Sequence, residues 1–289
     1  MTELLIKDSD LESLNDKVIV ITALISSSPR TGGSSGIGLA TTQILLSLGA
    51  KVVVGDLQCP KDGFSHPNLS FHRTDVTIWK DLVALFNAAK VQHGRIDHVF
   101  ANAGISYAAD YLSTETDENG DLKEPTWICE EVCLKACINT ATLGIFHMRP
   151  DRGGHGGSII VTASIAAFTH YRGVDYTASK HGVLGFMRGM HTLLGAAGLP
   201  IRINAIAPSW TYSGLVPREL LDVVGVQGQP PEAAARSALI LMADGTRTGQ
   251  LMHSAHERFK EIEESIFASA VLQVIGTDEP TEDEYSLWL

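Results

Sequence analysis

A glycine-rich turn between two short apolar runs constrains the fold of this chain most strongly. The runs Lys17 to Ile21 and Lys51 to Asp56 are rich in β-branched residues, and a helical pattern covers Leu39 to Leu48 between them. This order predicts a strand, a helix and a parallel strand. The turn, Thr31 to Gly38, lies at the start of the helix, where glycines let backbone N–H groups approach a pyrophosphate. The pattern therefore predicts a dinucleotide site in outline.

Further apolar runs alternate with helical patterns after this unit. We expect strands at 69–71, 98–101, 158–162 and 202–206, and helices near 78–93, 126–148 and 175–197. Regular alternation of this kind predicts an α/β fold with a parallel sheet covered by helices on both faces. Right-handed crossovers favour the doubly wound, Rossmann-type form. We expect a single domain over residues 1–289, with its core at about 15–255.

Two stretches interrupt the alternation. Residues 110–126 are acidic and contain the turn signal Asn119-Gly120, which predicts an exposed loop before a helix. The tail, residues 276–289, carries acidic residues and ends in Leu287-Trp288-Leu289. We expect this tail either to be disordered or to dock on a partner subunit.

The composition favours small-molecule chemistry. The net charge of −11 would repel nucleic acid and anionic membranes, and the basic residues form no block. The N-terminal region lacks the pattern of a signal peptide, and no apolar run approaches the roughly 20 residues that span a bilayer. We therefore expect a cytoplasmic protein whose four cysteines stay reduced.

Three of those cysteines repeat every four residues. Cys129, Cys133 and Cys137 would lie on one helix face. A metal site is one interpretation of such a stripe, but no Cys-x-x-Cys or nearby His pattern completes a tetrahedral set. A buried seam is the favoured interpretation, and we predict no bound metal.

Chemistry is indicated by Tyr176 and Lys180, which share a helix face at positions i and i+4. The Lys charge would favour loss of the phenol proton, as an acid/base catalyst of alcohol oxidation or ketone reduction requires. An isolated pair at this spacing is more often a solvated helix face. Ser164 changes that balance, because it closes the buried run 158–163 and its hydroxyl could orient a substrate oxygen.

With these motifs in this order, the chain resembles the classical short-chain dehydrogenase/reductase family over about residues 15–255. The family marks are a Thr-Gly-x-x-x-Gly-x-Gly turn, here Thr31 to Gly38, an Asn-Ala-Gly strand end at 102–104, a Ser, and Tyr-x-x-x-Lys. The runs 174–176, 180–185 and 202–210 look similar to a fungal branch near NAD-dependent 15-hydroxyprostaglandin dehydrogenase.

The resemblance implies an NAD(P) cofactor and assigns its site. Asp56 ends the second strand, where an acid would bind both hydroxyls of the adenosine ribose and repel a 2′-phosphate, so NAD is favoured over NADP. Asp75 and Val76 match the family's adenine contact. The implied cofactor-binding residues are Gly32, Ser34, Ser35, Gly36, Ile37, Gly38, Asp56, Asp75, Val76, Asn102, Ala103, Gly104, Tyr176, Lys180, Pro208 and Thr211.

The resemblance also implies the catalytic roles. Tyr176 is the acid/base, Lys180 supports it and holds the nicotinamide ribose, and Ser164 binds the substrate oxygen. The chain departs from the family pattern at two places. Residues 23–31 are an insertion close to the expected pyrophosphate, and Cys133 replaces an Asn that supports the family's proton relay. We expect a slowed relay, because a thiol is a weak substitute for an amide.

The substrate is expected to be an apolar small molecule. A variable lid is implied at about 209–230, with apolar residues from Leu215 to Val224, and His170 and Tyr171 either line its mouth or form an exposed loop pair. A homodimer or homotetramer follows by analogy.

The leading hypothesis is an NAD-dependent oxidoreductase acting on a secondary alcohol or ketone, in fungal secondary metabolism. The alternatives are an isomerase, dehydratase or cyclase on the same scaffold, impaired cofactor binding, and a catalytically silent binding protein.

Overall fold

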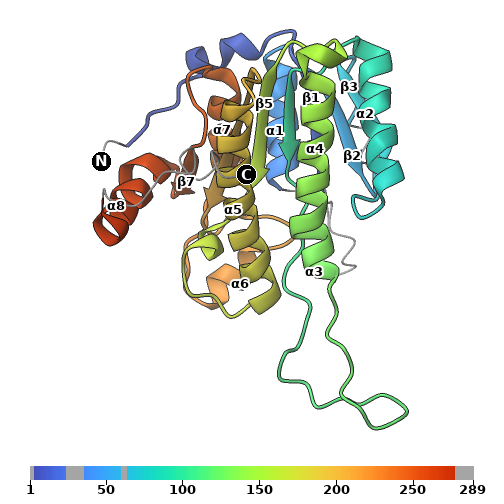
Figure 1. Cartoon of the computed structure of the whole chain (residues 1–289), viewed down its shortest axis with the longest axis vertical. Coiled ribbons are helices and arrows are strands. Elements are labelled where there is room, and N and C mark those ends of the chain that lie inside the picture. The colour runs from blue at the N-terminus through green and yellow to red at the C-terminus, as the bar shows by residue number, and fades with distance from the viewer. Residues whose placement is uncertain (1–2, 24–35, 60–63, 277–289) are drawn as a thin grey trace, which may run out of the picture.

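The computed structural model describes residues 3–23, 36–59 and 64–276, which form a sheet between two helical layers (Figure 1). The strand order is β3-β2-β1-β4-β5-β6-β7-β8. All neighbouring strands are parallel except β7 and β8. The strands are β1 (Val18–Thr22), β2 (Lys51–Asp56), β3 (Leu69–Arg73), β4 (His98–Ala101), β5 (Gly157–Thr162), β6 (Ile201–Pro208), β7 (Leu251–Ala255) and β8 (Arg258–Glu261).

The two helical layers bury the sheet from both sides, which explains the nearly continuous apolar strands. Helices α2 (Trp79–His93), α4 (Ala136–Met148) and α5 (Val174–Ala196) cover one face, and α1 (Ile37–Ser47) and α7 (Pro231–Ala243) cover the other. The short segments are η1 (Asp8–Leu14), α3 (Ile128–Glu130), η2 (Glu131–Lys135), η3 (Pro150–Arg152), η4 (Ile165–Ala167), α6 (Arg218–Val223), η5 (Glu263–Ala268) and α8 (Ser269–Ile275).

The predicted α/β Rossmann-type fold is confirmed, and the sheet extends further than the sequence indicated. Strand β1 pairs with both β2 and β4, so the strand order reverses there. In open α/β sheets, ligands bind beyond the carboxyl ends of strands at such a point. The prediction missed β7, β8 and α7. The run Leu251–Ala255 includes the polar residues His253 and Ser254, so it lacks a strong apolar pattern. Helix α7 begins with Pro-Glu-Ala-Ala-Ala, in which apolar and polar residues show little helical periodicity.

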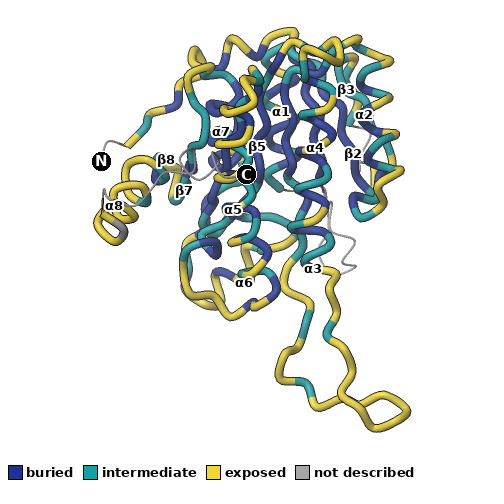
Figure 2. The backbone as a smooth tube through the Cα atoms, viewed as in Figure 1, coloured by how far each residue is buried: buried dark blue, intermediate teal, exposed yellow. Residues whose placement is uncertain are grey.

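The predicted exposed loop is present and extends away from the body of the molecule. Figure 2 shows residues 110–126 as a largely exposed arm. Its tip is a turn in which Asp117 Oδ1 accepts the backbone N–H groups of Asn119 at 2.8 Å and Asp121 at 3.0 Å. Gly120 has φ of 84°, a left-handed conformation that glycine adopts without strain.

The predicted cysteine seam is also confirmed, since Cys129, Cys133 and Cys137 are all buried. No helix within the described ranges combines the length and the apolar character needed to cross a bilayer.

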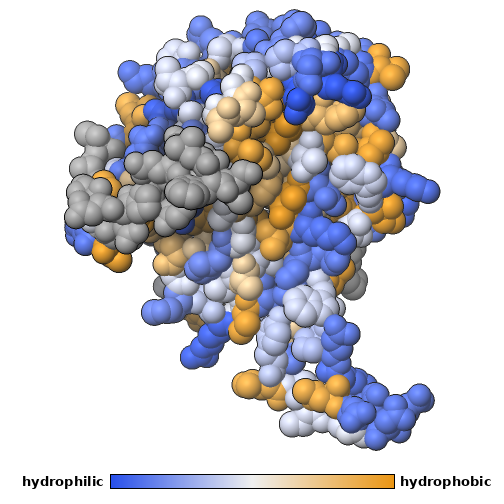
Figure 3. All heavy atoms as spheres, viewed as in Figure 1, coloured by the Kyte–Doolittle hydropathy of each residue, from blue (hydrophilic) through white to orange (hydrophobic). Residues whose placement is uncertain are grey.

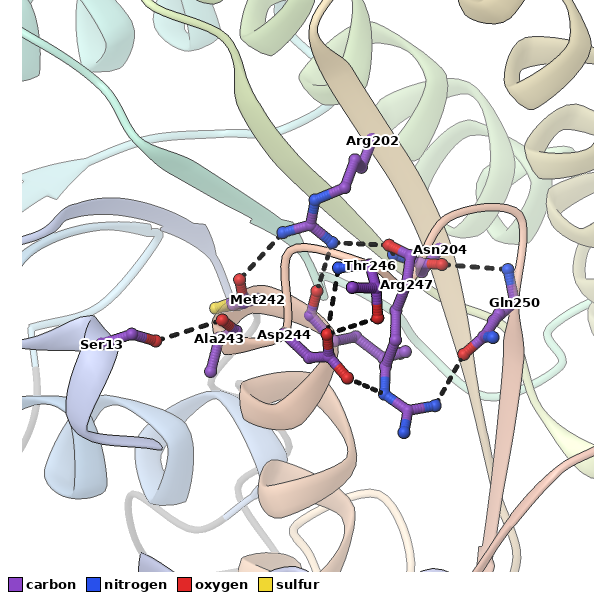
Figure 4. Close-up of polar contacts among 10 residues, drawn as sticks. Ser13, Arg202, Asn204, Met242, Ala243, Asp244, Thr246, Arg247 and Gln250 are labelled. Atoms are coloured by element: carbon purple, nitrogen blue, oxygen red, sulfur yellow. Dashed lines mark hydrogen bonds and ion pairs between the residues drawn. The ribbon is translucent and has the colours of Figure 1, made fainter. Parts of the chain in front are cut away.

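A partly buried arginine joins the sheet to the end of α7 (Figure 4). The Arg202 guanidinium donates to the backbone oxygens of Leu241 and Met242, each at 2.9 Å, and of Arg247 at 2.6 Å. Asn204 Nδ2 also donates to the Arg247 oxygen, at 3.0 Å. These bonds satisfy carbonyl groups that an ending helix leaves without partners. The Arg-Ile-Asn run of β6 is therefore structural.

Candidate active site

The predicted catalytic residues meet beyond the carboxyl end of β5. Ser164 follows β5 and caps η4, which packs against α5. Tyr176 and Lys180 lie on the first turns of α5, with Tyr176 half-buried and Lys180 only 2% exposed. The structure therefore places all three residues in one region.

Lys180 is held by the strand it faces. Its Nζ donates to the Thr162 carbonyl oxygen at 2.7 Å and lies 5.4 Å from the centre of the Tyr176 ring. Burial favours the neutral amine, but interactions with Tyr176 and Cys133 outweigh it, so the pKa of Lys180 is raised. Lys180 thus remains an ammonium beside the phenol.

Ser164 is oriented by the chain that follows it. Its Oγ accepts the Ala166 backbone N–H at 3.2 Å. This bond uses an oxygen lone pair, so the hydroxyl hydrogen can still be donated to a substrate oxygen.

A chain of aromatic ring contacts leads outward from Tyr176. Tyr171 makes edge contacts with Tyr176 at 6.1 Å, Trp210 at 6.2 Å and Tyr107 at 6.5 Å between ring centres. Tyr107 and Tyr171 are exposed at the outer side. These four residues, which we call the aromatic rim, include the predicted mouth residue Tyr171, whereas His170 is simply exposed.

Part of the predicted cofactor turn lies outside the described residues. This applies to Gly32, Ser34 and Ser35, and to residues 24–31 of the insertion. Gly36 caps α1 with φ of 139°, a conformation essentially restricted to glycine, and Ile37 is the first helical residue. The described end of the turn therefore has the backbone that the motif predicts.

Gly38 allows α1 to approach the strand ends closely. A Cβ atom at this position would lie 2.9 Å from Asn102 Nδ2 and 3.1 Å from Ala23 Cβ. Asn102 follows β4, where its N–H donates to Thr22 at 3.1 Å and its Oδ1 accepts the Thr162 hydroxyl at 3.4 Å. Asn102 thus ties three neighbouring strands together beside the glycine turn.

The rest of the Asn-Ala-Gly run leads toward Lys180. Ala103 is buried, and a Cβ atom on Gly104 would lie 3.7 Å from both Lys180 Nζ and Cys133 Sγ. Gly104 consequently lies between the lysine and the residue that replaces the relay asparagine.

Asp56 ends β2 beside the glycine turn. Its carboxylate is buried, and its Oδ1 accepts the Gln58 N–H at 3.1 Å. Asp56 and Gly38 line the same small, mainly apolar cavity of about 30 Å³. The predicted ribose contact and the end of the glycine turn are therefore neighbours.

The remaining predicted cofactor residues have structural contacts of their own. Asp75 Oδ1 accepts the Thr77 N–H at 2.9 Å and its hydroxyl at 2.7 Å, and the Val76 side chain belongs to the core. Pro208 ends β6. Thr211 is buried, and its hydroxyl donates to Ser209 at 2.8 Å.

Cys133 makes two contacts that resemble those of an amide. Its Sγ accepts the Ile105 N–H at 3.3 Å and donates to the Ile105 carbonyl oxygen at 3.4 Å. Cys129 Sγ donates to it at 4.0 Å. This bond and the charge of Lys180 lower the pKa of the Cys133 thiol, while the pKa of Cys129 is raised. Cys133 thus joins η2 to the chain beyond β4.

Sequence reasoning missed the residue that closes the base of the lid. Gln229 is 1% exposed, and its Nε2 donates to the Thr211 hydroxyl at 3.1 Å and to the Ser254 carbonyl oxygen at 3.0 Å. Backbone bonds join Gln229 to Trp210 and Tyr212. A lone Gln in a loop carries no local signal for this role. In the same segment, Ser213 lies near the start of α1, where its Cβ is 3.9 Å from the position of a Cβ added to Gly36.

The chain is similar to known proteins over most of its length. A family model described as short chain dehydrogenase matches residues 30–220. A short-chain dehydrogenase/reductase from Acremonium egyptiacum, ascJ, is 50% identical over 96% of this chain and 91% of its own length. Another, prx4 from Penicillium rubens, is 35% identical over 81% of this chain and 66% of its own length.

A solved structure shows the same fold. The 3-ketoacyl-(acyl-carrier-protein) reductase from Brucella melitensis, crystallised with NADH, aligns with a TM-score of 0.67 at 21% identity, covering 84% of this chain and 98% of that chain. None of these three proteins is a 15-hydroxyprostaglandin dehydrogenase, so the narrower likeness that the sequence indicated has no support here.

Proposed function

Because the chain belongs to the short-chain dehydrogenase/reductase family, we propose that it is an NAD-dependent oxidoreductase acting on a secondary alcohol or ketone of an apolar small molecule. The observation that carries the proposal is the placement of Lys180 Nζ beside the Tyr176 ring, with the ammonium anchored on Thr162. A buried, charged lysine next to a phenol is suited to proton transfer at a carbon that gains or loses a hydride.

The described residues fit a dinucleotide cofactor. Gly36 and Gly38 give α1 a start that only small residues allow, and that helix N-terminus would face the pyrophosphate. Asp56 would bind the adenosine ribose, and its buried charge would oppose a 2′-phosphate, which supports NAD over NADP. When bound, the nicotinamide supplies the position that accepts or returns the hydride.

The protein's own residues would handle the proton and the substrate oxygen. Tyr176 takes a proton from an alcohol, or gives one to a ketone, through its phenolic oxygen. Ser164 donates its hydroxyl hydrogen to the same substrate oxygen and so fixes the orientation. Lys180 keeps its positive charge beside the Tyr176 ring while the proton is transferred.

The surroundings of the site support an apolar substrate. The aromatic rim offers ring faces and edges to a hydrophobic ligand. In the lid, Leu215, Leu220, Val223 and Val224 are exposed, whereas Leu221 is buried. Exposed apolar side chains beside a site are available to cover a bound apolar molecule. The similarity to enzymes from Acremonium and Penicillium supports a place in fungal secondary metabolism.

The first test is a binding titration of the purified protein with NADH and, separately, NADPH. The proposal expects NADH to bind at least about tenfold more tightly, which corresponds to about 1.4 kcal/mol. Equal affinities would contradict the role given to Asp56, and an absence of binding to both would contradict the proposed reaction.

The second test follows nicotinamide absorbance with a panel of cyclic and aryl ketones, comparing the wild type with Tyr176→Phe. Loss of the phenolic oxygen should abolish turnover, while the variant still binds NADH through the other cofactor-binding residues. Turnover of a ligand without an absorbance change would instead favour the isomerase, dehydratase or cyclase alternative.

A further inference from the structure

Asp175 is a buried carboxylate that the proposed reaction does not use. It precedes Tyr176 in the first turn of α5, and its side chain is 0% exposed. Burying an ionised carboxylate costs several kcal/mol unless its oxygens accept hydrogen bonds. The position therefore has to be explained by what the carboxylate binds.

Three backbone N–H groups donate to Asp175. Its Oδ2 accepts from Ala108 at 2.7 Å and from Ala109 at 3.0 Å, and its Oδ1 accepts from Tyr176 at 2.9 Å. The bond from Tyr176 is local, and the positive end of the helix dipole assists it. The two bonds from the alanines are long-range, and capping of α5 does not require them.

Those two bonds restrain a segment with little internal structure. Between β4 and α3, residues 102–127 contain no helix or strand apart from an isolated bridge between Thr116 and Leu122. Ala108 directly follows Tyr107, which forms the outer end of the aromatic rim. Asp175 directly precedes Tyr176, which forms the inner end. The Asp175 carboxylate thus links the residues that follow Tyr107 to the helix turn that carries Tyr176.

We propose that Asp175 is a positioning residue that holds residues 107–109 against α5 and thereby fixes the width of the substrate entrance between Tyr107 and Tyr176. The inference rests on the proposed function, in which the substrate reaches Tyr176 past the rim. Without the two bonds, Ala108 and Ala109 would lose their hydrogen bonds to α5, and the chain leading into the arm at 110–126 would be held less firmly beside the site. The substrate entrance would then widen while Tyr176 and Lys180 keep their own contacts.

Two substitutions separate this role from helix capping. Asp175→Ser keeps an acceptor at the start of α5, but its hydroxyl is too short to reach Ala108 and Ala109. Asp175→Asn keeps the size of the side chain and one acceptor oxygen, so it should fold even if the Ser variant does not. Its amide nitrogen must face one of the three N–H donors, so at least one hydrogen bond is lost. The matched control is Asp97→Ser. Asp97 accepts the Val18 N–H at 2.7 Å from the opposite end of the strands.

The experiment measures amide hydrogen exchange of residues 105–112 and the near-ultraviolet circular dichroism of tyrosine, both on the full chain without ligand. Exchange at Ala108 and Ala109 should rise at least about tenfold in Asp175→Ser, since each lost bond to a charged acceptor is worth more than one factor of ten. The tyrosine signal should weaken, because coupling between the rim rings depends on their spacing.

Asp175→Asn should give intermediate values, and Asp97→Ser should change neither reading. Wild-type exchange and dichroism in both Asp175 variants would overturn the proposal and leave the carboxylate with only a local role, the acceptance of the Tyr176 N–H in the first turn of α5. Neither reading uses a nicotinamide or a substrate, so the inference and the proposed function can fail separately.

Discussion

The replacement of asparagine by Cys133 is the residue-scale feature most directly tied to rate. Its thiol makes both contacts to Ile105, at 3.3 and 3.4 Å, but an S–H group is a weak donor and sulfur a weak acceptor. These two contacts are therefore weaker than the bonds an amide could form at the same place. This supports a functioning but slowed site, and it explains why the cysteine need not abolish activity.

We predict that Cys133→Asn raises kcat several-fold, because an amide can form both bonds to Ile105 more strongly and hold the chain beside Lys180 more firmly. Steady-state oxidation of NADH with the best ketone from the panel measures the change. Cys137→Ala is the control. Cys137 is buried on the same helical face, so its loss should reduce stability without raising the rate. An unchanged or lower kcat in Cys133→Asn would contradict the slowed-relay interpretation.

The candidate catalytic residues were predictable because their signals are local. Tyr176 and Lys180 follow helical spacing, and Ser164 follows an apolar strand. The roles of Asp175 and Gln229 were not predictable, since their partners lie 67 and 25 residues away in the pairs with Ala108 and Ser254. A buried polar residue in the sequence gives no indication of which distant backbone groups it will meet.

At the scale of elements, α7 depends on a side chain from the sheet. Arg202 donates to three backbone oxygens at and beyond the end of the helix. Burial lowers the pKa of Arg202, and the charge of Asp244 partly offsets that effect. Hydrogen bonds to backbone oxygens therefore replace water in stabilising the charged guanidinium. The end of α7 and the start of β7 are fixed by this cluster, although neither element has a strong pattern of its own.

Arg202→Met should destabilise the protein by about 3 kcal/mol, because it leaves buried carbonyl groups without a donor. Urea unfolding measures the loss, and NADH affinity should remain within about twofold because the glycine turn lies on other elements. Arg258→Met is the comparison. Arg258 is 71% exposed and pairs with Glu3 at 3.9 Å, so its loss should cost less than about 0.5 kcal/mol. Equal losses of stability in the two variants would show that the hydrogen bonds from Arg202 to the end of α7 contribute nothing.

At the scale of the whole molecule, the alternation of strands and helices was sufficient to predict the doubly wound form. It did not predict the extension of the sheet by β7 and the antiparallel β8. β8 is a four-residue strand in which only Phe259 is buried, and it pairs along its length with β7. Such a strand is stabilised by its neighbour, so its own residues carry little information.

Acid stability of the molecule should depend on His98 in β4. Burial lowers the pKa of His98 to about 3, and its Nδ1 lies 2.8 Å from Ser158 Oγ. The unfolded chain therefore binds a proton near pH 6.5 that the folded chain does not, and stability falls as pH decreases from 6.5 toward 3.

From this single group we expect a loss of about 2 kcal/mol between pH 7 and pH 5. Urea unfolding at both pH values, for the wild type and for His98→Asn, measures it. The variant should be less stable at pH 7 and yet lose about 2 kcal/mol less on acidification. Burial also lowers the pKa of His93, His147 and His253, so only the difference between the two proteins tests His98. The same pH slope in both would refute the assignment.

The outer layer of the molecule supports self-association through α4 and α5. Figure 3 shows hydrophobic atoms gathered over the region of these two helices, where Phe146 and Leu193 are 44% and 60% exposed. On α5, Gly185 and Gly189 have open space where a side chain would project. Glycine inside a helix lowers its stability, so such positions are favourable where a second helix packs closely. We propose that two copies pair across this face.

Gly189→Gln tests that pairing, because it should stabilise the single chain and weaken the association of two chains. In a single chain the substitution should stabilise α5 by about 0.5 to 1 kcal/mol, since glutamine is a better helix former and meets no neighbour. Between two chains the same side chain would separate the helices. Sedimentation should therefore show a wild-type dimer or tetramer and a smaller, folded species for the variant. Gly195→Gln, at an equally open position near the end of α5, should keep the wild-type assembly. A monomeric wild type, or an unchanged assembly in Gly189→Gln, would place the subunit contact elsewhere.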